Sequence, residues 1–226
     1  MLVVEETMGL TEAARIPRQH GEPLLVSAVR YAEERHWDVF PGTWLEVVDG
    51  RERCSCGNAA CASPGAHPFH DDWATRATGS PVGARRLWAG HPEASILLPT
   101  GRTFDVLEVP ESSGCQALAR MERTDQALGP VACGPDRRMA LFVLPGAAAK
   151  VADLIRGLGW SPSGVDLVAK GEGGYVAAPP TRVGGLGAVQ WVRRPTRANR
   201  WLPDVQELIS PLAYACGRDA AAARGR

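Results

Sequence analysis

Residues 94–109 read ASILLPTGRTFDVLEV and contain two apolar runs separated by the turn Thr100-Gly101-Arg102. Short apolar runs bounded by turn residues are typical of buried β-strands. Helical patterns precede this stretch at residues 23–35 and 80–89 and follow it at 112–128. Strands and helices therefore intermix without the strict alternation of a doubly wound sheet. The sequence predicts an α+β fold in which helices flank a mixed or antiparallel sheet.

The remainder of the chain continues this mixed pattern. We expect strands at MALFVLP (139–145), VDLVA (165–169), GYVAAPP (174–180) and AVQWV (188–192), and a helix at 147–159. A last helix at 203–216 contains Pro211, which should kink or divide it. We expect one domain over residues 21–216, with flexible ends at 1–20 and 217–226.

Charge and hydropathy limit the class of protein. The 226 residues include 25 basic and 25 acidic side chains, so the net charge is zero. This balance excludes a protein coated in basic residues, although local basic patches remain compatible with it. No apolar signal peptide opens the chain, and no run of about 18 apolar residues is present. We expect a cytoplasmic protein that does not associate with a membrane.

A candidate zinc loop is inserted at residues 50–72. Its segment CSCGNAACASPGAHPFH (54–70) contains three of the six cysteines and two of the five histidines of the chain. Thiolate and imidazole are the ligands that zinc prefers, and four of them form a closed structural site. In a reducing cytoplasm, metal binding explains such a cluster better than disulfides do. The predicted ligands are Cys54, Cys56, Cys61 and His67, with His70 as the alternative to His67.

The stretch WVRRPTRANRW (191–201) combines arginines with two tryptophans and contains no acidic residue. Arginines beside aromatic rings can bind phosphates and stack on unpaired bases. The alternative is a solvated loop at the edge of the fold whose tryptophans pack inward. The candidate nucleic-acid-binding residues are Arg193, Arg194, Arg197 and Arg200.

Four motifs in this order resemble one known family. They are YAEERHWDVFP (31–41), PGAHP (64–68), PTGRTFDVLEVP (99–110) and VDLVAKGEGGYVAAPPT (165–181). Over about residues 22–205 the chain resembles the N-terminal domain of bifunctional DNA primase–polymerases (prim-pol), within the archaeo-eukaryotic primase superfamily. The short stand-alone actinobacterial members are especially similar. The resemblance implies nucleotidyl transfer by two divalent metals, Mg²⁺ or Mn²⁺, held by two carboxylates on one strand and a third on a later strand.

The match to the carboxylates of this family is incomplete. Aligned on the following Val-Pro, the chain has Val106 at the first acidic position and Glu108 at the second. Asp105 lies one position early, and on a regular strand it faces away from Glu108 because their separation is three. A one-residue bulge would return it to the site. Asp166 occupies the position of the later acidic residue.

The phosphate-binding histidine of the family is also missing. Met139 occupies its position, directly after Arg137 and Arg138, and arginine can bind triphosphate as well.

These departures leave several functional interpretations open. The chain is either a prim-pol relative with a degenerate site that binds nucleotide or nucleic acid, or an active template-dependent primase–polymerase. A non-catalytic protein-interaction module is a further alternative. Because no helicase pattern follows residue 217, any priming would depend on a separate helicase or replication protein. The candidate catalytic residues are Asp105, Glu108 and Asp166, with Arg137 and Arg138 as phosphate ligands.

Overall fold

The computed structural model describes residues 23–224, and side-chain environments are defined up to residue 218. The predicted N-terminal segment 1–20 lies outside the described residues. The helices are α1 (Leu24–Arg35), α2 (Trp73–Arg76), α3 (Pro81–Trp88), α4 (Glu111–Arg123), α5 (Ala147–Gly157) and α6 (Val205–Arg224). The longer strands are β2 (Leu45–Val48), β3 (Arg51–Cys54), β4 (Ile96–Pro99), β5 (Asp105–Pro110), β7 (Arg138–Val143) and β12 (Gln190–Arg193). The shorter ones are β1 (Phe40–Pro41), β6 (Val131–Cys133), β8 (Val168–Lys170), β9 (Tyr175–Ala177), β10 (Arg182–Val183) and β11 (Gly187–Ala188).

The central element is a five-stranded sheet in the order β12-β6-β7-β5-β8. All of its described strand pairs are antiparallel, which confirms the predicted α+β class with an antiparallel sheet. The predicted strand at 94–99 joins a second sheet, β1-β4-β9. The two strands of the stretch 94–109 therefore belong to different sheets, and the turn at Thr100-Gly101-Arg102 carries the chain from one to the other.

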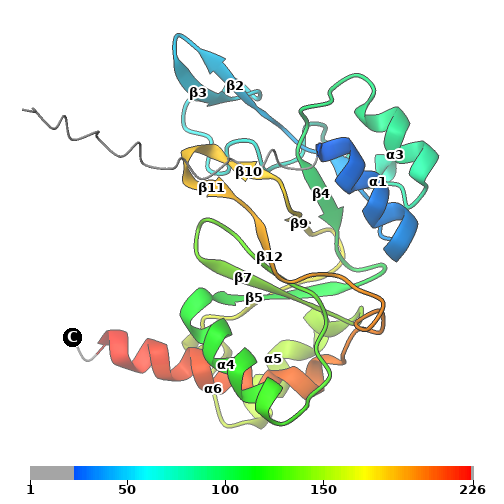
Figure 1. Cartoon of the computed structure of the whole chain (residues 1–226). Coiled ribbons are helices and arrows are strands. Elements are labelled where there is room, and N and C mark those ends of the chain that lie inside the picture. The colour runs from blue at the N-terminus through cyan, green and yellow to red at the C-terminus, as the bar shows by residue number, and fades with distance from the viewer. Residues whose placement is uncertain (1–22, 225–226) are drawn as a thin grey trace, which may run out of the picture.

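Two hydrophobic clusters lie on opposite faces of the five-stranded sheet. Helices α4, α5 and α6 cover one face, and their apolar side chains pack with Leu107, Val109 and Leu141 of the strands. Val106 and Phe142 belong to the second cluster, which includes residues of α1, α3 and β4. Figure 1 shows α1, α3 and β4 on the side of the sheet away from α4, α5 and α6. Successive side chains of β5 therefore alternate between the two clusters, as they do along any regular strand.

Helix α6 extends past the predicted end of the domain. Pro211 lies inside it without dividing it, and the helix runs to Arg224 rather than giving way to a flexible tail at residue 217. A side chain at Gly217 would come within 2.5 Å of the Trp160 ring. Gly217, the residue after the predicted helix, therefore lies within α6 and allows close packing against Trp160. In the part of the chain that the structure describes, no helix is both long and apolar enough to cross a membrane.

The Cys/His loop begins on a hairpin. Strands β2 and β3 pair from Leu45↔Cys54 to Val48↔Arg51. Asp49 and Gly50 form the turn, both with positive φ, as two-residue hairpin turns require. The loop is then held against the strands that follow β9, because the backbone N–H of Gly184 donates to the Pro64 carbonyl over 2.9 Å.

Candidate functional site

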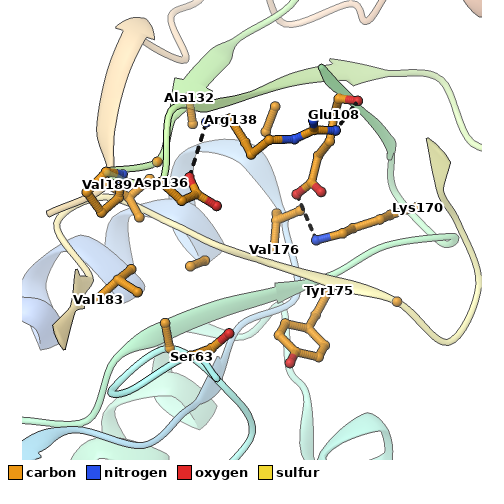
Figure 2. A pocket seen from close by; sticks show the side chains of 16 residues that line it. Ser63, Glu108, Ala132, Asp136, Arg138, Lys170, Tyr175, Val176, Val183 and Val189 are labelled. Carbon is orange, nitrogen blue, oxygen red and sulfur yellow. Dashed lines mark hydrogen bonds and ion pairs between the residues drawn. The ribbon is translucent and has the colours of Figure 1, made fainter. Parts of the chain in front are cut away.

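A cavity of about 380 Å³ lies against the five-stranded sheet on the face away from α4, α5 and α6. Its wall is formed by β5, β6, β7 and β8 of the five-stranded sheet, by β9 and β10 of the two neighbouring sheets, by the turn after β6 and by the Cys/His loop (Figure 2). We call it the central cleft. Its polar lining residues are Ser63, Glu108, Asp136, Arg138, Lys170 and Tyr175.

The carboxylate of Glu108 is already paired with a cation of the protein. Its Oε1 atom lies 2.7 Å from Nζ of Lys170, and the two side chains are only 20% and 33% exposed. Strand pairing explains this contact, because Glu108 is opposite Val168 and Lys170 is two residues further along the same face of β8. The lysine therefore occupies space beside the carboxylate that a metal ion would need.

Arg138 is the second cation of the central cleft. Its guanidinium donates to Oδ1 of Asp166 over 2.7 Å and to the Glu108 carbonyl over 3.2 Å. Asp166 precedes β8, and its side chain is about half exposed. Asp166 does not line the cleft, and it reaches Glu108 only through the arginine. The predicted acidic residue is thus a partner of Arg138 rather than a neighbour of Glu108.

Asp105 lies on the opposite face of the sheet. The register between β5 and β7 is continuous from Asp105↔Val143 to Pro110↔Arg138, so no bulge turns this side chain toward Glu108. The Asp105 side chain is buried, and its Oδ2 accepts a hydrogen bond from the backbone N–H of Ala148 over 2.9 Å. A carboxylate at a helix N-terminus satisfies free N–H groups and complements the helix dipole. Asp105 therefore caps α5.

The two predicted phosphate ligands, Arg137 and Arg138, have different surroundings. Arg138 enters the central cleft, whereas Arg137 has a positive φ of 63° and its side chain pairs with Glu111 at 3.0 Å. Met139, at the position of the family histidine, is buried in the cluster beneath the helices. Of these three neighbours only Arg138 lines the cleft.

The side chains of the central cleft do not fit a pair of divalent cations. Glu108 and Asp136 are the only carboxylates among its lining residues, and Asp136 accepts from the Arg138 backbone N–H over 3.2 Å. The residues next to Glu108 on this face are Val106 along β5, Ala140 opposite it on β7 and Val168 opposite it on β8, and none of them is a carboxylate. Among the side chains that the structure describes, no group of three carboxylates converges on one point. Two-metal sites need several anionic oxygens around both ions.

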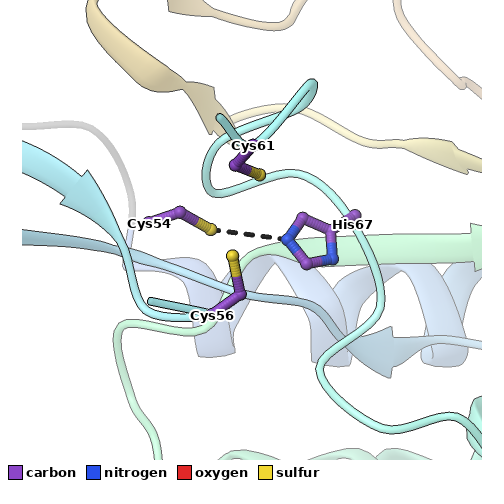
Figure 3. A group of neighbouring side chains, drawn as sticks. All are labelled: Cys54, Cys56, Cys61 and His67. Carbon is purple, nitrogen blue, oxygen red and sulfur yellow. Dashed lines mark hydrogen bonds between the residues drawn. The ribbon is translucent and has the colours of Figure 1, made fainter. Parts of the chain in front are cut away.

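The Cys/His loop, in contrast, brings four ligand atoms together. Those of Cys54, Cys56, Cys61 and His67 all lie within 4.8 Å of one another (Figure 3). In a tetrahedral zinc site with Zn–S bonds of ~2.3 Å, the ligand atoms are about 3.8 Å apart. The group could therefore hold a metal such as zinc after a small contraction. The exposed His70 side chain lies outside the group, so His67 is the fourth member.

Hydrogen bonds around the group prepare two of its members as ligands. The His67 Nδ1 atom lies 3.0 Å from the Pro68 carbonyl, which holds the proton on Nδ1 and leaves the Nε2 lone pair for a metal. Burial acts to raise the pKa of the Cys54 thiol. Hydrogen bonds from the backbone of Cys56 and Gly65 and from the side chain of Thr43 outweigh it and lower the pKa to about 6.

The pKa of the Cys61 thiol is shifted in the opposite direction from that of Cys54. Burial, together with the neighbouring Cys54 and Cys56 thiols, raises the pKa of Cys61 to about 11. Cys61 is therefore protonated at neutral pH without a metal and must lose this proton to ligate one.

The Cys/His loop also forms part of the central cleft. Ser63 and Ala66, which lie between Cys61 and His67 in the sequence, both line the cleft, and Figure 2 shows Ser63 across from the sheet. Tyr175 lines it as well, and burial raises the pKa of its phenol, so the hydroxyl remains a neutral hydrogen-bond donor.

The arginines of 191–201 fall into two groups. Arg193 pairs with Glu122 of α4 at 3.2 Å, which directs it away from a ligand role. Arg194, Arg197 and Arg200 are exposed, and no acidic side chain of the described residues pairs with them. The tryptophans also differ, because Trp191 is partly buried and donates to the Tyr31 hydroxyl over 3.0 Å, whereas Trp201 is 87% exposed.

Lys170 and Tyr175 were not predicted as site residues. Both follow Asp166 within the glycine-containing segment that ends in GGYVAAPP. Lys170 is one of only two lysines in the chain, which is a weak signal in the sequence. Its contact with Glu108 depends on the pairing of β8 with β5, which no local sequence pattern encodes.

Comparison with known proteins assigns the chain to a family. The family model described as "Bifunctional DNA primase/polymerase, N-terminal" (Prim-Pol) matches residues 28–204, from α1 to the residue before α6. No curated protein matches the chain. The match covers most of the sequence, including every strand, the central cleft and the Cys/His group. The chain therefore belongs to the Prim-Pol family, that of the N-terminal domain of bifunctional DNA primase/polymerases.

Proposed function

We propose that this chain is a Prim-Pol protein that binds a nucleotide in its central cleft and does not transfer it. The observation that carries the proposal is the ion pair between Glu108 and Lys170, with 2.7 Å between Oε1 and Nζ. Phosphoryl-transfer enzymes of the two-metal type use divalent cations to activate the attacking oxygen and to stabilise the leaving one. In the central cleft Glu108 is neutralised by Lys170, and the other lining carboxylate, Asp136, accepts from the Arg138 backbone N–H. The cleft therefore offers no cluster of free anionic oxygens for two metal ions.

The same side chains support phosphate binding without a metal. The Lys170 ammonium and the Arg138 guanidinium both line the central cleft, and both carry donors that suit phosphate oxygens. Each cation has a carboxylate partner, Glu108 and Asp166 respectively, which holds its side chain in place. A bound triphosphate would share these donors with the carboxylates. Tyr175 adds a neutral donor and an aromatic surface to the cleft.

The metal in the Cys/His group, which we propose is zinc, has a structural role in this protein. Four protein ligands leave no open position for a substrate. Its contribution to the cleft is indirect and consists of holding the segment with Ser63 and Ala66 in place.

A primer-extension assay combined with a binding assay tests the proposed function. The purified chain is incubated with primed template, dNTPs and Mn²⁺ or Mg²⁺, and dATP binding is measured by calorimetry with and without EDTA. We expect no extension, and nucleotide binding that persists in EDTA. Template-dependent extension that Glu108→Gln or Asp166→Ala abolishes would refute the proposal. Binding that requires a divalent cation would refute its metal-independent part.

A further inference from the structure

A basic and aromatic surface lies outside the central cleft, on the loop that connects β12 to α6. It consists of Arg194, Arg197, Arg200 and Trp201, and we call it the arginine–tryptophan loop. Its three guanidinium groups are exposed and have no carboxylate partner among the described residues. Trp201 is the most exposed of the large apolar side chains in the described part of the chain, at 87%. Uncompensated positive charge and an open indole face thus occur within one short loop.

This loop is held in one conformation by two buried or half-buried side chains. Asn199 is 8% exposed, and its amide accepts from the Thr196 backbone N–H over 2.7 Å and donates to the Arg194 carbonyl over 2.8 Å. Arg35 of α1 donates to the carbonyls of Thr196 and Asn199 over 2.9 and 3.0 Å. Because the backbone is fixed by these contacts, a ligand would meet the exposed side chains without first ordering the loop.

A groove of about 770 Å³ adjoins the loop. Arg194, Pro195 and Thr196 form one side of it, and residues of α1 form another. Trp191 lines it as well. Val189 lines both this groove and the central cleft, so the two are neighbours separated by β11 and the start of β12.

We propose that the arginine–tryptophan loop binds single-stranded nucleic acid, with Trp201 stacking on an unpaired base and Arg194, Arg197 and Arg200 contacting phosphates. This surface is distinct from the central cleft, and its function stands or falls separately from nucleotide binding there. Charge complementarity favours a polyanion, and the open indole offers a face that every base can stack on. A duplex hides its base faces, so the indole would add nothing to duplex binding. The neighbouring groove gives the strand a path along α1.

Anisotropy of a fluorescein-labelled oligothymidylate, with the full chain at low salt, tests this proposal. Trp201→Ala should weaken binding about fivefold or more, which is the worth of one stacked base, while Trp201→Phe keeps an aromatic face and most of the affinity. Arg197→Ala should weaken binding and reduce the slope of log K against log salt by about 0.7. The matched control is Arg85→Ala, which removes one exposed guanidinium from α3 and should change neither quantity.

Several results would overturn the proposal. The wild type could fail to bind the oligonucleotide, or Trp201→Ala and Arg197→Ala could bind it as tightly as the wild type. Trp201-dependent binding to duplex DNA or to phosphatidylserine vesicles, as strong as to the oligothymidylate, would also contradict it and assign the surface to another partner. Calorimetry with dATP on the same variants separates the two proposals. Retained dATP binding with no oligonucleotide binding refutes only the surface proposed here.

Discussion

Glu108 and Lys170 lie on neighbouring antiparallel strands, diagonally across one face of the sheet, and their charged atoms are 2.7 Å apart. The pair is mostly shielded from water, so its attraction is screened less than that of an exposed pair. Removing one partner leaves the other charge partly buried without compensation. Each charge of this pair therefore compensates the other, and replacing one residue shows what the other does alone.

Replacing Lys170 should reveal the metal affinity of Glu108 and weaken nucleotide binding. Lys170→Ala removes a charge-assisted contact to phosphate, worth ~1.5–3 kcal/mol, so we expect at least about a tenfold loss of dATP affinity. Weak Mn²⁺ binding should appear, because the carboxylate is free. Calorimetry and electron paramagnetic resonance measure the two effects. The control is Lys150→Ala, which removes the other lysine of the chain, an exposed residue of α5 that pairs with Asp204 and does not line the cleft. Equal dATP affinity in the two variants would contradict the role given to Lys170.

A second carboxylate beside Glu108 should strengthen the metal site. Val168 is directly opposite Glu108 and half exposed, so an aspartate there brings two carboxylates to one face at little cost of burial. Val168→Asp in the Lys170→Ala background should bind Mn²⁺ more tightly than Lys170→Ala alone. Val168→Asn in the same background provides the isosteric neutral control. No gain over this control would mean that the missing charges are not what limits metal binding.

Loss of a cysteine of the Cys/His group should remove the metal and destabilise the fold. Cys61→Ser leaves three ligands, and we expect the metal content to fall from about one equivalent to well below half. Thermal unfolding should shift to lower temperature, and EDTA should produce the same shift in the wild type. Cys115→Ser, at an exposed cysteine outside the group, should change neither. Equal metal content in the two variants would rule out the four-ligand group.

Asp105 should matter for stability and not for binding. Asp105→Ala leaves the Ala148 N–H without its acceptor at the start of α5 and should cost about 1–3 kcal/mol in the free energy of unfolding. Urea denaturation measures this cost. The dATP affinity of the folded variant should equal that of the wild type, because Asp105 lies on the helix-covered face of the sheet. A large loss of affinity at unchanged stability would show that Asp105 belongs to the central cleft after all.

Local patterns predicted much of this structure. The Cys/His group follows from spacing within one loop, and it required no knowledge of distant contacts. The alternation of side chains on a strand predicted that Asp105 and Glu108 face apart, and the regular register with β7 confirms this. The family resemblance drawn from four motifs is confirmed by the Prim-Pol match.

Contacts between distant segments were beyond prediction. The order of strands in the sheet decides that Lys170 meets Glu108, and that order depends on all five strands together. The same holds for the two tryptophans at the ends of 191–201, which look equivalent in sequence. Trp191 is partly buried because Tyr31, far away in the chain, accepts its indole N–H, whereas no such partner covers Trp201.

The segment between Cys61 and His67 contributes to two structures at once, the metal group and one wall of the central cleft. We expect oxidation of the thiols, or removal of a metal bound there, to displace Ser63 and Ala66 and so to change the shape of the cleft. Under the proposed zinc site and the proposed nucleotide binding, a protein preparation that has lost its metal is expected to show a lower nucleotide affinity than the metal-loaded protein.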